Sequence, residues 1–155
     1  MSTSYRRILV PIDGSPTATR GLDEAIALCK ATGGSIRVLH VMDDLVFVSG
    51  FESGATYARD VVPQLRKRSE QLLEAGRKRA EAAGLPADQV LVECFARRTS
   101  EIVCEQAIAW RADLIVVGTH GRTGVAHVLM GSVAQRVVQH SSCPVLVIPP
   151  AHRPN

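Results

Sequence analysis

The sequence has few aromatic residues: three phenylalanines, two tyrosines and a single tryptophan in 155 residues. Flavin electron carriers usually stack aromatic side chains on the flavin ring. The hydroxyl residues Ser15, Thr17 and Thr19 follow the first apolar run and could suit a flavin phosphate. However, the tryptophan, Trp110, is expected on a helix, away from the ends of the strands. The scarcity of aromatic residues therefore disfavours a flavin carrier.

Long apolar runs are also absent. No stretch of about 18 apolar residues occurs, so the sequence predicts no transmembrane helix. The N-terminal stretch MSTSYRRILVPID reaches Asp13 too soon to form the apolar core of a signal peptide. We therefore expect a cytoplasmic protein without a membrane partner.

The excess of positive charge is small. The net charge is +3 and the sequence pI is about 8.9, which does not indicate a nucleic-acid partner. The basic residues at 66–68 and 77–79 alternate with Glu70, Glu74 and Glu81. This pattern predicts a solvated helix face, with a polyanion site as the second interpretation.

Paired metal ligands are missing as well. The four cysteines, Cys29, Cys94, Cys104 and Cys143, contain no C-x-x-C pair, and each lies in an apolar pattern. We therefore predict small buried apolar side chains and neither a metal site nor a disulfide framework. The five histidines have no metal-ligand spacing, and His120 has no visible carboxylate partner, so a structural or solvated role is preferred for it.

Short apolar runs alternate with amphipathic segments along one domain, residues 1–155, whose tail from 150 to 155 is expected to be disordered. Strands are predicted at 7–12, 35–42, 89–95, 113–118 and 143–150, and helices at 15–34, 63–83, 99–110 and 131–141. Residues 43–58 lack clear periodicity and are predicted to form a loop. The alternation predicts a doubly wound, Rossmann-like α/β fold, in which helices cover both faces of a five-stranded parallel sheet. The expected strand order is 3-2-1-4-5, with the third strand near an edge.

Several residues predict how these helices begin and which side they bury. Ser15 is expected to be the N-cap of the first helix, with Pro16 at its first position and Gly33 and Gly34 at its end. Thr99 or Ser100 is expected to cap the third long helix. The buried side of the first helix is predicted to carry Ala18, Leu22, Ala25, Ile26 and Cys29, and that of the second Leu65, Ser69, Leu72, Gly76, Ala80 and Ala83. The third is expected to bury Val103, Ala107 and Trp110.

Two loops follow strands at the edge where an open parallel sheet binds ligands. One is PIDGSP, and the other is GTHGRTGVAHVLMGS, which starts at Gly118. We expect Gly118 to leave room for a sugar or base, and Gly121 to allow a close approach to phosphate. Gly131 and Ser132 open a helix whose first N–H groups lack intrahelical partners, so a phosphate could bind there without a lysine. Alternatively, the glycines are turn residues and Ser132 only caps its helix.

Other phosphate-binding schemes are excluded by missing residues. No G-x-x-x-x-G-K-[ST] motif occurs, and no G-x-G-x-x-G follows the first strand, which argues against P-loop and dinucleotide-binding sites. The third strand ends in CFARR, where a two-component receiver would need an aspartate.

The spacing G-x2-G-x9-G-[ST] of Gly118, Gly121, Gly131 and Ser132 resembles the signature of the ATP-binding branch of the universal stress protein family. The resemblance spans nearly the whole chain and includes RILVPIDGS, DLIVVGTHGRTG and GSVAQRVVQHSSCPVLVI. It implies ATP as the ligand. It implies nucleoside contacts from Pro11, Ile12 and Asp13, an adenine contact from the Val41 backbone, ribose contacts at Val117 and Gly118, and phosphate contacts from Gly121, Gly131, Ser132 and Val133. Arg122 stands where relatives commonly carry Lys or Arg, and either a phosphate contact or solvated surface suits it.

The function of such a site has two interpretations. The first is an ATP-binding regulatory protein that acts through unidentified partners. The second is a slow ATPase or a nucleotide-dependent transferase. Catalysis would need a base and a cationic group, and the available residues, Asp13 and Arg122, do not form a convincing set. Asp13 could instead be a turn residue, accept from ribose hydroxyls or bind Mg²⁺, and the Ser132 hydroxyl could also contact such an ion.

The last strand suggests a homodimer. Residues 145–148 (VLVI) are all apolar, with no charge to protect a sheet edge. Two such strands could pair around a twofold axis, and the family resemblance implies the same dimer. Alternatively, the tail after Ile148 covers the edge.

Overall fold

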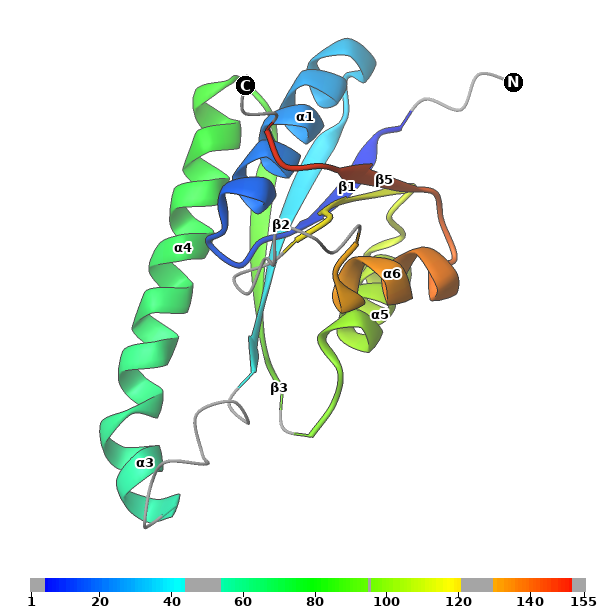
Figure 1. Ribbon diagram of the computed structural model, residues 1–155. Coiled ribbons are helices and arrows are strands. Elements are labelled where there is room, and N and C mark those ends of the chain that lie inside the picture. The colour runs from blue at the N-terminus through cyan, green and yellow to red at the C-terminus, as the bar shows by residue number, and fades with distance from the viewer. Residues whose placement is uncertain (1–4, 44–53, 95, 121–129, 152–155) are drawn as a thin grey trace.

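Five parallel strands form one sheet in the order β3-β2-β1-β4-β5, as Figure 1 shows for the computed structural model. The structure describes residues 5–43, 54–94, 96–120 and 130–151. The strands are β1 (Arg7–Pro11), β2 (Ser35–Asp43), β3 (Ala87–Cys94), β4 (Leu114–Gly118) and β5 (Val145–Ile148). The predicted fold class and strand order are confirmed.

Helices cover both faces of the sheet (Figure 1). Helices α1 (Pro16–Thr32) and α4 (Val62–Ala82) lie on one face, and α5 (Thr99–Trp110) and α6 (Ser132–His140) lie on the other. A short helix, α3 (Gly54–Asp60), precedes α4. Since each crossover between parallel strands carries a helix to one face or the other, the chain reverses its winding between β1 and β4.

The ends of α1 follow from local chemistry. The Ser15 side chain accepts a hydrogen bond from the Ala18 N–H at 3.2 Å, and Pro16 occupies the first turn. Gly33 ends the helix with φ +72°, and its N–H donates to the Cys29 carbonyl at 2.8 Å. Both predicted boundaries are confirmed, and they fix where the turn after β1 lies.

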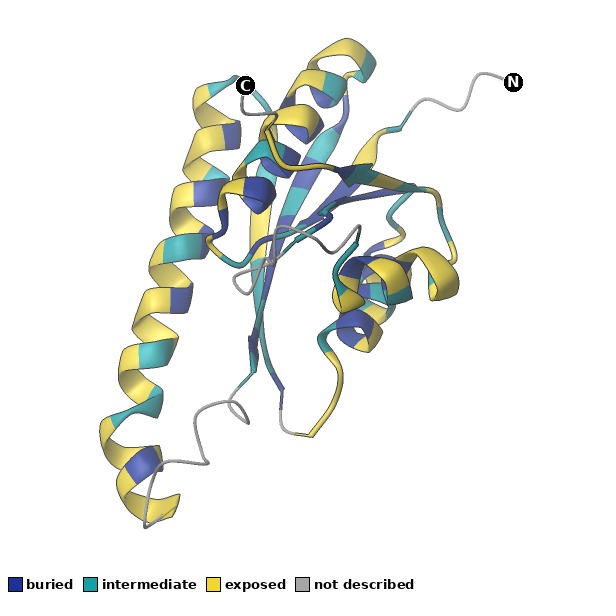
Figure 2. Cartoon of the chain, in the orientation of Figure 1, coloured by how far each residue is buried: buried dark blue, intermediate teal, exposed yellow. Residues whose placement is uncertain are grey.

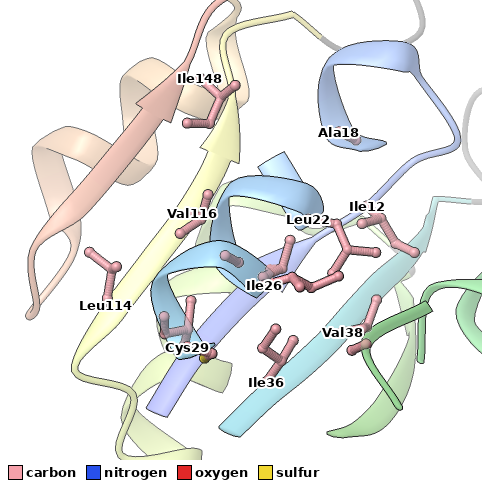
Figure 3. Close-up of a cluster of buried hydrophobic side chains, with 14 of the residues drawn as sticks. Ile12, Ala18, Leu22, Ile26, Cys29, Ile36, Val38, Leu114, Val116 and Ile148 are labelled. Carbon is pink, nitrogen blue, oxygen red and sulfur yellow. The ribbon is translucent and has the colours of Figure 1, made fainter. Parts of the chain in front are cut away.

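Two apolar clusters hold the layers together, one on each face of the sheet. The cluster between the sheet and α1 and α4 includes the predicted side of α1, together with Ile36, Val38, Leu114, Val116 and Ile148 (Figure 3). The other cluster packs β-strand residues against Val103, Ala107, Trp110, Ala134 and Val137 of α5 and α6. Figure 2 shows the buried stripe of α4 facing the sheet and its exposed outer side.

Some sequence predictions are wrong in detail. Residues 54–58, predicted as loop, belong to α3, where a single buried side chain, Tyr57, leaves too little periodicity to detect. Residues 44–53 lie outside the described part. Helix α5 has Arg98 as its N-cap and no side-chain cap bond, so neither Thr99 nor Ser100 caps it. In α4, Leu73 is fully buried together with Ser69, Gly76 and Ala80, whereas the predicted Leu72 and Ala83 are half-buried and pack against the same cluster.

The cysteines are free thiols, as predicted, but only two of them are buried. Cys29 and Cys94 are buried, whereas Cys104 and Cys143 are half-buried. Burial raises the pKa of the Cys29 thiol to about 11, and the nearby Asp113 carboxylate contributes in the same direction. Cys29 is therefore a neutral core side chain at physiological pH.

The basic stretch of α4 forms ion pairs, in agreement with a solvated face. Arg77 lies 2.7 Å from Glu81, Lys78 lies 2.8 Å from Glu74, and Arg79 reaches Asp23 on α1 at 2.6 Å. Among the described helices, none combines the length and apolar character needed to cross a membrane.

Candidate nucleotide-binding site

The sheet opens at its carboxyl edge between β1 and β4. Within the described strands, pairing between them runs from Ile8–Leu114 to Leu9–Ile115 and then stops. Both strands continue beyond this point, β1 to Pro11 and β4 to Gly118. This is the topological switch point, where open α/β sheets place their ligands.

The turn after β1 lies on one side of this opening. The half-buried Asp13 accepts a hydrogen bond from the Ser15 N–H through Oδ1 at 2.9 Å, and Gly14 adopts φ +82°. This hydrogen bond gives Asp13 the turn role that the sequence suggested as one alternative. The arrangement places Pro11, Ile12 and Asp13 together at the carboxyl edge.

Val41 presents its backbone toward the same region. The Ser35 N–H donates to the Arg6 carbonyl at 2.7 Å, and the Leu39 carbonyl accepts from the Ile12 N–H at 2.8 Å. Alternate residues of a strand direct their backbone groups to the same neighbour, so the N–H and carbonyl of Val41 also point to the β1 side. Strand β1 ends at Pro11, before it reaches Val41. No hydrogen bond joins the Val41 N–H to the Ile12 carbonyl.

The structure gives a packing reason for glycine at position 118, in addition to the room for a sugar or base that the sequence predicts. A Cβ atom on Gly118 would lie 2.8 Å from Cγ2 of Thr17 and 3.2 Å from the Thr17 carbonyl carbon. Helix α1 therefore packs directly onto the end of β4. Packing therefore requires a glycine here even without a ligand, so the glycine by itself is no evidence for a sugar or base at this position.

The loop between β4 and α6 is closed by a backbone hydrogen bond. The Gly131 N–H donates to the Thr119 carbonyl at 2.6 Å, and the Thr119 N–H donates to the Ile148 carbonyl at 2.9 Å. A Cβ on Gly131 would lie 2.9 Å from that Thr119 oxygen. The start of α6 is thus fixed next to the end of β4, on the second side of the opening.

This closure changes which donors α6 offers. The Gly131 N–H, predicted as a phosphate donor, is already bonded to Thr119. The first helical bond runs from the Gln135 N–H to the Gly131 carbonyl at 3.0 Å. The N–H groups of Ser132, Val133 and Ala134 therefore have no intrahelical acceptor. Ser132 and Val133 are exposed, and the helix dipole favours an anion at this end.

Two histidines lie near the opening. His120 Nδ1 is 2.8 Å from Thr119 Oγ1, which fits the structural role preferred from the sequence. His40 is buried in β2, and its Nδ1 is 2.7 Å from the Ile12 carbonyl. Sequence reasoning missed His40, and the available signal was a histidine between the apolar residues Val38, Leu39, Val41 and Met42.

Two predicted site residues, Gly121 and Arg122, lie outside the described residues. The described ones come from four segments that meet at one edge: the end of β1, Val41 of β2, Val117 and Gly118 of β4, and the start of α6. No group of three or more histidine, cysteine or acidic residues with metal-site geometry occurs within the described ranges.

Comparison with known proteins agrees with this architecture. Residues 4–149 match the model of the universal stress protein family. The universal stress protein MJ0531 of Methanocaldococcus jannaschii is 33% identical over 144 residues, which cover 93% of this chain and 82% of that protein.

Solved structures share the fold. The protein MJ0577 superposes with a TM-score of 0.86 at 25% identity, covering 97% of this chain and all of that chain. A universal stress protein solved in complex with cAMP has a TM-score of 0.67 at 24% identity, over 95% of this chain and 98% of that one. One from Archaeoglobus fulgidus, solved in complex with dAMP, has a TM-score of 0.65 at 21% identity, over 94% and 99%. With the family model matching almost its entire length, this chain belongs to the universal stress protein family.

Proposed function

We propose that this chain binds ATP at the opening between β1 and β4 and acts as a cytoplasmic regulatory module through protein partners. The observation that carries the proposal is the position of the Val41 backbone opposite the start of α6. Between them lie the ends of β1 and β4, which are not paired with each other. A base at one side and phosphates at the other would span this opening.

The Val41 backbone suits adenine. Its N–H is a donor for adenine N1, and its carbonyl is an acceptor for the adenine amino group. Guanine presents the reverse pattern, with a donor at N1 and an acceptor at O6. Backbone groups on the β1 side of β2 would therefore favour ATP over GTP, since buried polar groups left unpaired by the wrong base cost binding free energy.

The start of α6 suits the phosphates. The N–H groups of Ser132 and Val133 would donate to phosphate oxygens, assisted by the helix dipole. Val117 and Gly118 would flank the ribose, with Pro11 and Ile12 facing the nucleoside. From the family motif we assign further phosphate contacts to Gly121, Gly131 and Arg122. Since its N–H is bonded to Thr119, Gly131 would act by allowing close approach.

Magnesium would bind together with the triphosphate. Carboxylate and hydroxyl oxygens are the ligands it prefers, so Asp13 or Ser132 fits as a protein ligand. The relatives solved with cAMP and dAMP support an adenine nucleotide in this family's fold, and ATP is our assignment for this chain.

We expect hydrolysis by the isolated protein to be slow, well below the enzyme median of about 10 s⁻¹. No lysine accompanies the last glycine of the motif, and the Asp13 carboxylate is engaged in the turn. Robust turnover that a Ser132→Ala substitution abolishes would instead support the slow-ATPase or transferase alternative.

We further propose a homodimer through β5. The two edges of the sheet differ in their protection. Strand β3 carries charged and polar side chains that pair with α4: Glu93 pairs with Arg66, and Gln89 accepts from Arg77 Nε at 3.0 Å. Charge on an edge strand disfavours pairing with another strand. Strand β5 carries no charged residue, and its Leu146 is 39% exposed. An apolar edge strand with an exposed leucine favours pairing with a second copy.

The proposed function is tested by the nucleotide content of freshly purified protein, released by denaturation and identified by mass. We expect the released nucleotide to be an adenine nucleotide, mainly ATP, at up to about one equivalent per chain. Protein that carries no nucleotide and also fails to bind added ATP would contradict the proposal.

A further inference from the structure

We propose that His40 is a positioning residue that keeps the Val41 backbone open to the base of a bound nucleotide. It does so by holding the Ile12 carbonyl, which would otherwise pair with Val41. The proposal rests on the proposed nucleotide-binding function and adds a determinant of base selectivity that lies beneath the site.

The pairing pattern of β1 and β2 shows what His40 replaces. The Ile12 N–H donates to the Leu39 carbonyl at 2.8 Å. In a regular parallel ladder, the carbonyl of the same residue would accept from the N–H two residues further along the partner strand. That partner is Val41. The Ile12 carbonyl is instead 2.7 Å from His40 Nδ1, so a side chain takes the place of the next ladder bond.

The chemistry of this contact fixes the direction of the hydrogen bond. A carbonyl oxygen only accepts, so His40 Nδ1 carries the proton and donates it. His40 is 6% exposed and Ile12 is 7% exposed, and water therefore has little access to the bond. A buried carbonyl that lost this donor would need another.

The nearest backbone donor by ladder register is the Val41 N–H. If it paired with Ile12, β1 would extend by one bond and the turn carrying Asp13 would move toward β2. The same N–H would no longer be available to adenine N1. His40 thus separates two uses of Val41: a sheet hydrogen bond and a contact with the base.

Two amide substitutions distinguish positioning from simple filling of space. The side-chain nitrogen of Asn lies at nearly the same distance from the backbone as His Nδ1, so His40→Asn can still donate to Ile12. The amide of Gln lies one bond further out, near the position of Nε2. His40→Leu fills the space without any donor.

The experiment measures ATP and GTP affinities by calorimetry for the wild-type protein and these three variants, each checked for folding by circular dichroism. We expect His40→Leu and His40→Gln to bind ATP about tenfold more weakly, with GTP affinity nearly unchanged, so that the ATP preference falls. We expect His40→Asn to retain most of the wild-type affinity and preference.

The outcomes separate failure of the proposed ATP binding from failure of the role proposed for His40. Wild-type protein that binds no ATP would overturn the proposed function, and this inference with it. Wild-type protein that prefers ATP, together with folded His40→Leu of unchanged preference, would overturn the inference alone. If His40→Leu does not fold, equal behaviour of the Asn and Gln variants would overturn it.

Discussion

Gly118 and Thr17 touch so closely that a single added carbon atom would not fit between them. A Cβ on Gly118 would lie 2.8 Å from Thr17 Cγ2. One glycine of the G-x2-G-x9-G-[ST] motif therefore packs β4 against α1 whether or not a ligand is bound. The glycine motif and the integrity of the fold are linked at this contact.

Gly118→Ala should destabilise the ligand-free protein. Overpacking of this kind costs about 1–3 kcal/mol in the free energy of unfolding, and urea denaturation measures it. Adding Thr17→Ala should recover part of the loss, because it removes Cγ2. Gly54→Ala, where an added Cβ meets nothing within 4 Å, is the matched control and should have little effect. A Gly118→Ala protein as stable as the wild type would contradict this prediction and show that α1 can shift to accommodate the added Cβ.

At Gly131, steric and electrostatic effects can be separated by comparing two substitutions. Alanine and aspartate both place a Cβ 2.9 Å from the Thr119 oxygen, but only aspartate adds a negative charge where we expect the phosphates. Gly131→Asp should bind ATP at least about tenfold more weakly than Gly131→Ala. Asp is a favourable N-cap and should not by itself unfold α6, and circular dichroism checks that both variants are folded. Equal ATP affinities for the two variants would place the phosphates elsewhere.

The proposed dimer is best tested at Leu146. Val147 packs against the buried cluster on the α5 and α6 face, so a lysine there would also disturb the core. Leu146→Lys should convert a micromolar dimer to a monomer in sedimentation equilibrium. Ile108 of α5, 62% exposed, supplies the control, and Ile108→Lys should remain dimeric. A wild-type monomer at micromolar concentration would rule the arrangement out.

The buried thiol of Cys29 predicts a dependence of stability on pH. Burial raises its pKa from 9.0 to about 11 in the folded protein. The unfolded chain thus loses this proton first, and the stabilising contribution is complete below about pH 9 and is lost as the pH rises toward 11. The stability difference between the wild type and Cys29→Ala should shrink by about 2–3 kcal/mol from pH 8 to pH 11. If the free energies of unfolding of the two proteins change in parallel with pH, the predicted role of the Cys29 thiol is contradicted.

Periodicity predicted the sheet and its main helices well, because apolar strands and one-sided helices leave strong signals. The boundaries of α1 were also predictable, since Ser15 and Gly33 act through neighbouring atoms. Contacts between distant segments were not. The packing of Gly118 on Thr17, the bond from Gly131 to Thr119 and the contact of His40 with Ile12 depend on the folded geometry. Helix α3 was missed because only Tyr57 is buried in it.

The candidate site was also predictable only in part, since its contacts between distant segments could not be foreseen. The sequence placed its residues on the correct strand ends and predicted a helix at Ser132. It assigned the Gly131 N–H to phosphate, although that donor is bonded to Thr119, because a sequence does not reveal which backbone donors are already paired. It also could not show that Val41 directs its backbone toward the opening, since this depends on the register between β1 and β2.

The central claim is that the opening between β1 and β4 binds ATP and that its backbone recognises the adenine. The most direct measurement is a calorimetric titration of nucleotide-free protein with ATP and, separately, with GTP, both in the presence of magnesium. We predict saturable ATP binding at one site per chain, and GTP binding at least about tenfold weaker. Absence of ATP binding, or equal affinity for the two nucleotides, would contradict the account.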